Sequence, residues 1–124
     1  MRKTSVFLLV AGFVLGCSSS EDDRPSGERF TTEFGRAACL RLSECFPERF
    51  AAKYATYSDD QARQNGCVRE LQDSMRAKYS SSDLQQPVKC ERSEAQACVD
   101  GIYQLRCEAF DDVIKNAPST CNEC

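Results

Sequence analysis

Residues 30–45, FTTEFGRAACLRLSEC, decide the fold class of this chain. The apolar side chains in this stretch follow one another at steps of four, four, four and three residues, as Phe30, Phe34, Ala38, Leu42 and Cys45. Side chains at these steps share one face of an α-helix. The helix should end before Pro47, because a residue that precedes proline disfavours the α conformation. The stretch therefore predicts an amphipathic helix that also carries cysteines.

The same periodicity occurs twice more, each time after a candidate helix cap. Ser58 and Gln61 have the spacing of a capping box, and the helix after them would bury a stripe of Val68, Leu71, Met75 and Tyr79, with Cys67 beside it. Ser93 and Gln96 repeat that spacing, and the stripe after them consists of Ala95, Cys98, Val99, Ile102 and Leu105. Two further amphipathic helices are therefore expected.

Shorter segments complete the expected fold. Residues 48–57 have a helical face of Phe50, Ala51 and Tyr54, and a last short helix should carry Val113 and Ile114. Residues 80–87 are predicted to be a loop, since serine and a final proline interrupt the periodicity. No run of β-branched residues alternates with a period of two. We therefore predict an all-α fold, a small disulfide-rich bundle of about three to five helices.

The N-terminus has the composition of an export signal. Arg2 and Lys3 precede an apolar run of ten residues, Val6 to Leu15. A helix of that length rises only about 15 Å, roughly half the hydrocarbon thickness of a bilayer. The run is therefore too short to cross a membrane, and the small residue Gly16 follows it as expected for a cleavage site.

The end of this run, Val14-Leu15-Gly16-Cys17, resembles the lipobox of bacterial lipoprotein signal peptides. The resemblance implies cleavage between Gly16 and Cys17, a diacylglyceryl group on the Cys17 thiol and a further acyl chain, such as palmitate, on the new amine. Two acyl chains anchor a protein stably to a membrane. Ser18, in place of Asp, favours the outer membrane in the sorting rule of enteric bacteria. We expect a lipid-anchored protein of the cell envelope.

Three regions are expected along the chain. Residues 1–16 would be the signal peptide, residues 17–29 the lipidated cysteine with a flexible polar linker, and residues 30–124 one disulfide-stapled helical domain. Cleavage would leave 124 − 16 = 108 residues, with 14 basic and 19 acidic side chains and a net charge of −5. Such a chain lacks the basic patch of a nucleic-acid binder. Histidine is absent, which excludes Ser-His-Asp and Cys-His catalysis within this chain.

Eight cysteines follow Cys17: Cys39, Cys45, Cys67, Cys90, Cys98, Cys107, Cys121 and Cys124. An even number in a short exported chain indicates four disulfides. Eight cysteines can pair in about 105 ways, and their spacing does not choose among these. The sequence therefore predicts the bonds without their connectivity.

Three chemical roles are alternatives to this structural role of the cysteines and carboxylates. Cys121 and Cys124 form the single C-x-x-C, but no helix follows to stabilise a thiolate for thiol–disulfide exchange. A four-cysteine zinc site would require a second such pair. The carboxylate pairs Asp59-Asp60 and Asp111-Asp112 lie where helices are expected to begin, and there negative charge is favourable without any catalytic role. No metal or cofactor is expected.

The cysteine framework resembles that of small cysteine-rich lipoproteins of myxobacteria and their relatives. The likeness lies in Ala38-Cys39-x₅-Cys45, in Ala97-Cys98-x₈-Cys107, and in the run from Cys107-Glu108-Ala109-Phe110 to Pro118-x-x-Cys121. It covers most of residues 38–121, and it implies a scaffold and no chemistry.

The expected function is a structural or protein-interaction role at the envelope, without enzymatic activity. The expected partners are the membrane, through lipid on Cys17, and an envelope protein. Two alternatives remain open: an inhibitor or immunity factor that binds an envelope enzyme, and a thiol–disulfide redox protein using Cys121 and Cys124.

Overall fold

The computed structural model describes residues 23–110, 118–122 and 124. Its elements in chain order are α1 (Gly27–Cys45), α2 (Pro47–Lys53), α3 (Asp60–Lys78), α4 (Ser81–Gln85), α5 (Arg92–Tyr103), α6 (Cys107–Phe110) and the short 3₁₀ helix η1 (Ser119–Cys121). Within these residues the only β-type pairing is an isolated antiparallel bridge between Ser26 and Pro87. The predicted all-α, disulfide-rich fold is confirmed.

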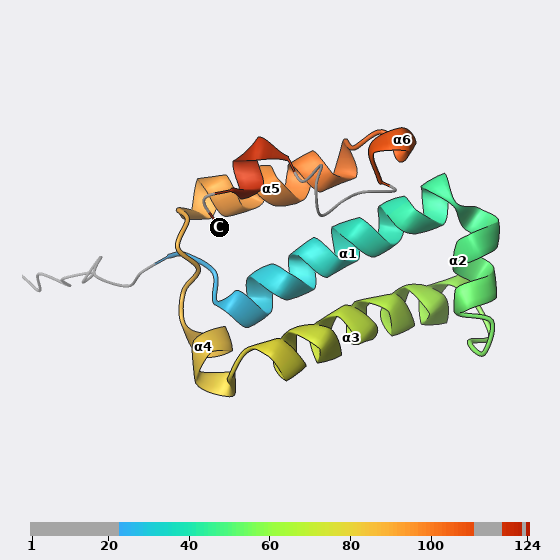
Figure 1. Cartoon of the computed structure of the whole chain (residues 1–124), viewed down its shortest axis with the longest axis horizontal. Coiled ribbons are helices and arrows are strands. Elements are labelled where there is room, and N and C mark those ends of the chain that lie inside the picture. Colours follow the sequence, from blue (N-terminus) through green and yellow to red (C-terminus); the bar gives the residue numbers. More distant parts are fainter. Residues whose placement is uncertain (1–22, 111–117, 123) are drawn as a thin grey trace, which may run out of the picture.

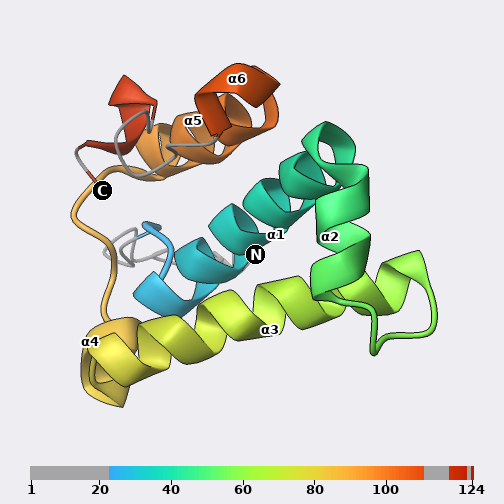
Figure 2. The same cartoon turned by 45° about the vertical axis from the view of Figure 1, so that its right-hand side comes forward.

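Helix α1 is the centre of the molecule. Figures 1 and 2 show it between α3 on one side and α5 on the other, with α2 crossing at its C-terminal end. Helix α3 runs back along α1, so the C-terminal end of α3 and the short α4 lie beside the N-terminal end of α1 (Figure 1). Because α1 is covered on two sides, its buried surface is wider than the single stripe expected from the sequence.

The boundaries of α1 follow from local chemistry. The Ser26 hydroxyl accepts a hydrogen bond from the backbone N–H of Arg29 at 3.2 Å and caps the helix. The helix therefore begins at Gly27 and not at Phe30, where the apolar stripe starts. It ends at Cys45, as predicted, and Pro47 opens α2 at a position where its missing N–H is harmless.

The segment before α1 is fixed by backbone hydrogen bonds. The N–H of Val88 donates to the carbonyl of Pro25 at 2.9 Å, and the N–H of Gly27 donates to the carbonyl of Gln86 at 2.9 Å. Together with the Ser26 cap, these bonds correct the predicted linker boundary, because the residues from Pro25 onward belong to the folded domain. The remaining linker residues before Asp23 lie outside the described residues.

The N-cap of α3 lies one residue later than predicted. Asp59, and not Ser58, is the N-cap, and its carboxylate accepts from the N–H of Ala62 at 2.8 Å. Gln61, the expected partner in a capping box, donates instead to the Asn65 side chain at 3.2 Å. A carboxylate at this place also interacts favourably with the positive end of the helix dipole, which explains the choice.

Two further boundaries also differ from the predictions. The stretch expected to be a loop contains α4, a single turn that Ser80 caps by accepting from the N–H of Asp83 at 3.2 Å. Helix α5 begins after Glu91, whose N–H donates to the Glu94 side chain at 2.8 Å, so the capping box lies two residues before the predicted Ser93. The expected helix around Val113 and Ile114 lies outside the described residues.

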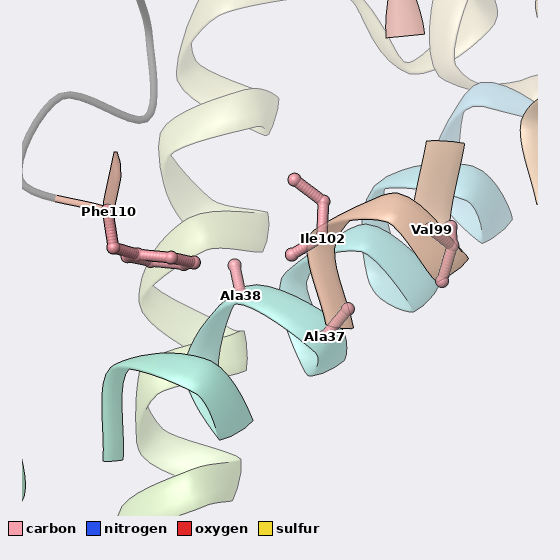
Figure 3. Close-up of a cluster of buried hydrophobic side chains, with 5 residues drawn as sticks. All are labelled: Ala37, Ala38, Val99, Ile102 and Phe110. Carbon is pink, nitrogen blue, oxygen red and sulfur yellow. The ribbon is translucent and has the colours of Figure 1, made fainter. Parts of the chain in front are cut away.

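The main core lies between α1 and α5. Its buried members are Ala37, Ala38, Val99, Ile102 and Phe110 (Figure 3). The two alanines of α1 face the aliphatic side chains of α5, and the ring of Phe110 points towards Ala38. Of the face predicted for α5, Ala95, Cys98, Val99 and Ile102 are buried, and Leu105 packs at the edge.

A second core cluster joins α1, α2 and α3. Phe50 and Tyr54 pack with their ring centroids 4.9 Å apart, against the buried Cys39 and Cys67. The face predicted for α3 lies at the margin of this cluster: Val68, Leu71 and Met75 are half-buried, whereas Tyr79 is 44% exposed. The most buried residues of α3 are Gly66 and Cys67, because the tyrosines that follow α2 cover that turn.

Candidate functional site

The eight cysteines form four disulfides. They are Cys39–Cys67, Cys45–Cys107, Cys90–Cys124 and Cys98–Cys121. The first joins the middle of α1 to α3, and the second joins the end of α1 to α6. The other two tie η1 and the last residue to α5 and to the segment that precedes it. The first two disulfides thus hold α3 and α6 to α1 independently of the small core.

The two cysteines of the C-x-x-C are not bonded to each other. Cys121 pairs with Cys98, which is fully buried, and Cys124 pairs with Cys90, which is 2% exposed. An exchange centre requires that the two thiols of the motif exchange with one another. In this arrangement both act as half-cystines that fasten the C-terminal segment.

A guanidinium lies beside the second disulfide. Arg41 of α1 bonds to Glu44 at 2.7 Å and to the backbone carbonyl of Leu105, and one of its nitrogens lies 4.0 Å from the Cys107 sulfur. Its Nε is buried without a partner. Arg41 therefore holds the turn between α5 and α6 against α1, next to the Cys45–Cys107 bond.

Lys53, Tyr54 and Glu70 form the one cluster of side chains with shifted pKa values among the described residues. Glu70 bonds to the Lys53 ammonium at 3.0 Å and accepts from the Tyr54 hydroxyl at 2.9 Å. The hydrogen bond from Lys53 lowers the pKa of Glu70, and the same bond raises the pKa of Lys53. Burial raises the pKa of Tyr54. All three shifts move titration away from neutral pH, which is the opposite of what a general acid or base requires.

Of the two carboxylate pairs that are candidates for acid–base chemistry, the structure describes Asp59 and Asp60. Asp59 caps α3, and Asp60 is paired with Arg63 at 2.8 Å with its side chain 97% exposed. The second pair, Asp111 and Asp112, lies outside the described residues. Asp59 and Asp60 therefore have structural partners at the start of α3.

The N-terminal half of α1 lies beside α4 and the C-terminal half of α3 (Figure 1). An apolar groove is lined by residues of these three helices and of the segment after α4. It has a volume of about 700 Å³, and its apolar lining includes Phe30, Phe34, Leu71, Met75, Leu84 and Val88. We call it the α1–α3–α4 groove. No sequence pattern indicates this groove, because its walls come from three helices and a connecting segment that meet only in the folded chain.

The residues predicted for processing lie outside the described part of the chain. Gly16 and Cys17, the predicted cleavage and lipidation positions, precede Asp23, where the description begins. Among the described residues no helix is both long and apolar enough to cross a membrane. Four disulfides in so small a domain place the protein outside the cytoplasm, since reducing thiols would keep these cysteines free there.

Comparison with known proteins adds no identification. No family model matches the chain, and neither a curated protein nor a solved structure was found to be similar to it. The fold and chemistry described above therefore define the protein as a small, helical, four-disulfide domain that functions outside the cytoplasm.

Proposed function

We propose that this protein is a lipoprotein of the bacterial cell envelope, anchored through Cys17, whose helical domain has a structural or protein-interaction role and no catalytic activity. The observation that carries the proposal is the pairing of the cysteines. Each of the eight cysteines after Cys17 is bonded to another of the eight. Cys17 has no partner left in the chain, and its thiol stands directly after the apolar run and Gly16.

The chemistry of the domain supports a binding role over a catalytic one. No described cysteine is free, and the polar cluster of Lys53, Tyr54 and Glu70 titrates away from neutral pH. The domain is instead cross-linked at four places, which restrains the shape of its surface. A rigid domain on a tether presents a preorganised surface to a partner, which lowers the entropic cost of binding.

The anchoring is tested by the intact mass of the native, membrane-extracted protein, with alkylation before and after reduction. The expected result is a chain that begins at Cys17, carries the mass of two or three acyl groups, and takes up alkylating reagent only after reduction, at the eight disulfide cysteines. A Cys17→Ser chain is the control and should leave the membrane fraction. An unlipidated native chain, or one that begins elsewhere, would refute the anchoring.

The interaction role is tested by pull-down from detergent-solubilised envelope, with the Cys17→Ser chain as a matched bait that keeps the same domain. Specific enrichment of one envelope protein by both baits supports the role, and recovery of nothing above background contradicts it. If the enriched protein is a hydrolase that the domain inhibits tightly, the inhibitor or immunity-factor alternative replaces a structural role.

A further inference from the structure

The α1–α3–α4 groove leaves apolar surface that the described part of the chain does not cover. Phe30, Phe34 and Met75 in its walls are only partly buried, and Tyr79 at its end is 44% exposed. Met75 is unbranched and flexible, so it adapts its shape to an irregular apolar guest. The volume of about 700 Å³ lies within the range of small-molecule sites.

The charge of the lining indicates what kind of guest fits. Among the residues that line the groove, Asp83 and Lys89 are the charged ones, and both are exposed at its rim. The rest of the lining supplies mainly aromatic, aliphatic and thioether carbon, with the uncharged polar residues Thr31, Ser74, Gln86 and Asn122 among it. An ionic ligand would lose its hydration in this mainly apolar groove, whereas an aliphatic chain has no hydrogen bonds to water that it could lose. The groove is therefore suited to a hydrocarbon chain.

The place where the folded domain begins indicates which hydrocarbon chain is within reach of the groove. Gly27 lines the groove, and the backbone bonds of Pro25 to Val88 and of Gly27 to Gln86 fix the start of the domain at its rim. Eight residues separate this fixed point from the start of the predicted mature chain, Cys17 to Arg24. At no more than ~3.6 Å per residue they span at most about 29 Å, so a group on Cys17 stays within reach of the groove.

We propose that the α1–α3–α4 groove takes up one acyl chain of the lipid on Cys17 when the domain is away from a bilayer. The inference rests on the proposed lipidation of Cys17. A short tether makes this binding intramolecular at an effective concentration in the millimolar range, so weak intrinsic affinity suffices. In a membrane the bilayer accepts all the acyl chains of the anchor, and the groove is emptied. The groove thus shields part of the anchor from water during transfer between membranes.

The test uses the mature chain, Cys17–Cys124, with its four disulfides formed and with Cys17 unlipidated. In this chain Cys17 is the free thiol and Met75 is the single methionine. Cys17 is alkylated with a decyl group or, as control, with an ethyl group, and the ¹³C-labelled Met75 methyl group is observed by NMR. The decyl chain is expected to shift the Met75 signal, independently of protein concentration, and the ethyl group to leave it unchanged.

Two variants locate the effect. Val88→Glu places a carboxylate in the groove and should abolish the decyl-dependent shift, whereas Gln61→Glu adds the same charge to an exposed position of α3 outside the groove and should preserve it. Far-ultraviolet circular dichroism verifies that both variants fold. A decyl-dependent shift that survives Val88→Glu, or an unshifted Met75 signal in the parent chain, would overturn the proposal.

Other occupants of the groove give different outcomes. A shift that grows with protein concentration would assign the groove to a second copy of the chain and overturn the proposal. Free decanoate added to the ethyl-capped chain is expected to act only in the millimolar range, and saturation at micromolar levels would make the groove a site for free lipid instead. Because the decyl group is attached chemically, these results do not depend on lipidation in the cell, which the mass measurement tests separately.

Discussion

The removal of single disulfides distinguishes the contribution of loop length from that of burial. The Cys45–Cys107 bond closes a loop with a sequence separation of 62, and the Cys39–Cys67 bond closes one of 28. In the chain-entropy model these loops contribute about 4.3 and about 3.6 kcal/mol respectively. On loop length alone, Cys45→Ala/Cys107→Ala should therefore be the more destabilising double variant.

The burial of the cysteine side chains reverses this expected order of destabilisation. Cys39 is fully buried and Cys67 is 1% exposed, whereas Cys45 and Cys107 are both only partly buried. If each deleted core sulfur is counted as one methylene, it adds about 0.8 kcal/mol, and the space it leaves adds a further cavity term. We therefore expect Cys39→Ala/Cys67→Ala to lower the free energy of unfolding by about 5 to 6 kcal/mol, against about 4 kcal/mol for the other variant.

The assay is urea unfolding without reductant, followed by far-ultraviolet circular dichroism, with free energies taken from linear extrapolation. Domains of this kind are stable by only about 5–15 kcal/mol, so Cys39→Ala/Cys67→Ala is also measured with a stabilising osmolyte that keeps it folded. The reasoning is refuted if the variant that lacks Cys45 and Cys107 is equally or more destabilised, because the difference in burial would then have no energetic weight.

Other substitutions test the local contacts. Gly35→Ala should raise the free energy of unfolding by about 0.5–1 kcal/mol, because alanine favours the helix and its Cβ would make an ordinary contact with Leu71 at 3.5 Å. Gly66→Ala should lower the free energy of unfolding by about 1 kcal/mol, because its Cβ would lie only 2.5 Å from the Tyr57 ring. Both are measured as urea midpoints, and a shared sign would contradict the packing described. Arg41→Ala should lower the free energy of unfolding by about 1 kcal/mol, because the partly buried Leu105 carbonyl would lose its charged donor. An unchanged midpoint would show that the guanidinium contributes nothing there. The Glu70–Lys53 ion pair is half exposed and contributes about 0.2–1 kcal/mol to the free energy of unfolding. Because folding lowers the pKa of Glu70, the difference in melting temperature between the parent and Glu70→Gln should be full at pH 7 and should vanish as the pH falls below the carboxyl pKa. A difference that persists in acid would contradict this contribution of the ion pair.

The helices themselves were predictable because their signals are local. The steps of four, four, four and three from Phe30 to Cys45 and the break at Pro47 depend only on the period of the helix and on proline sterics. The caps were harder to predict, since neighbouring polar residues compete for the same N–H groups. At α3 the N-cap is Asp59, one residue after the predicted Ser58. Helix α4 was missed because a single turn has no periodicity and depends on the burial of Leu84.

Some candidate sites were likewise predictable from the sequence, whereas others form only in the folded chain. The basic and apolar residues at the N-terminus, the lipobox-like end at Cys17 and the even number of later cysteines are properties of the sequence, and they led to the expectations on compartment and anchoring. The contact of Lys53 with Glu70 joins α2 to α3, and no spacing rule connects residues on separate helices. The α1–α3–α4 groove likewise exists only where three helices and the segment after α4 meet.

The sequence by itself determined that this is an all-α, cysteine-rich chain, because helical periodicity and cysteine parity do not depend on long-range contacts. Only the tertiary structure decided which cysteines pair. Of about 105 pairings, the one formed brings together residues 23 to 62 positions apart. That selection follows from which helices lie beside α1, and the burial of apolar faces from distant parts of the chain determines their position.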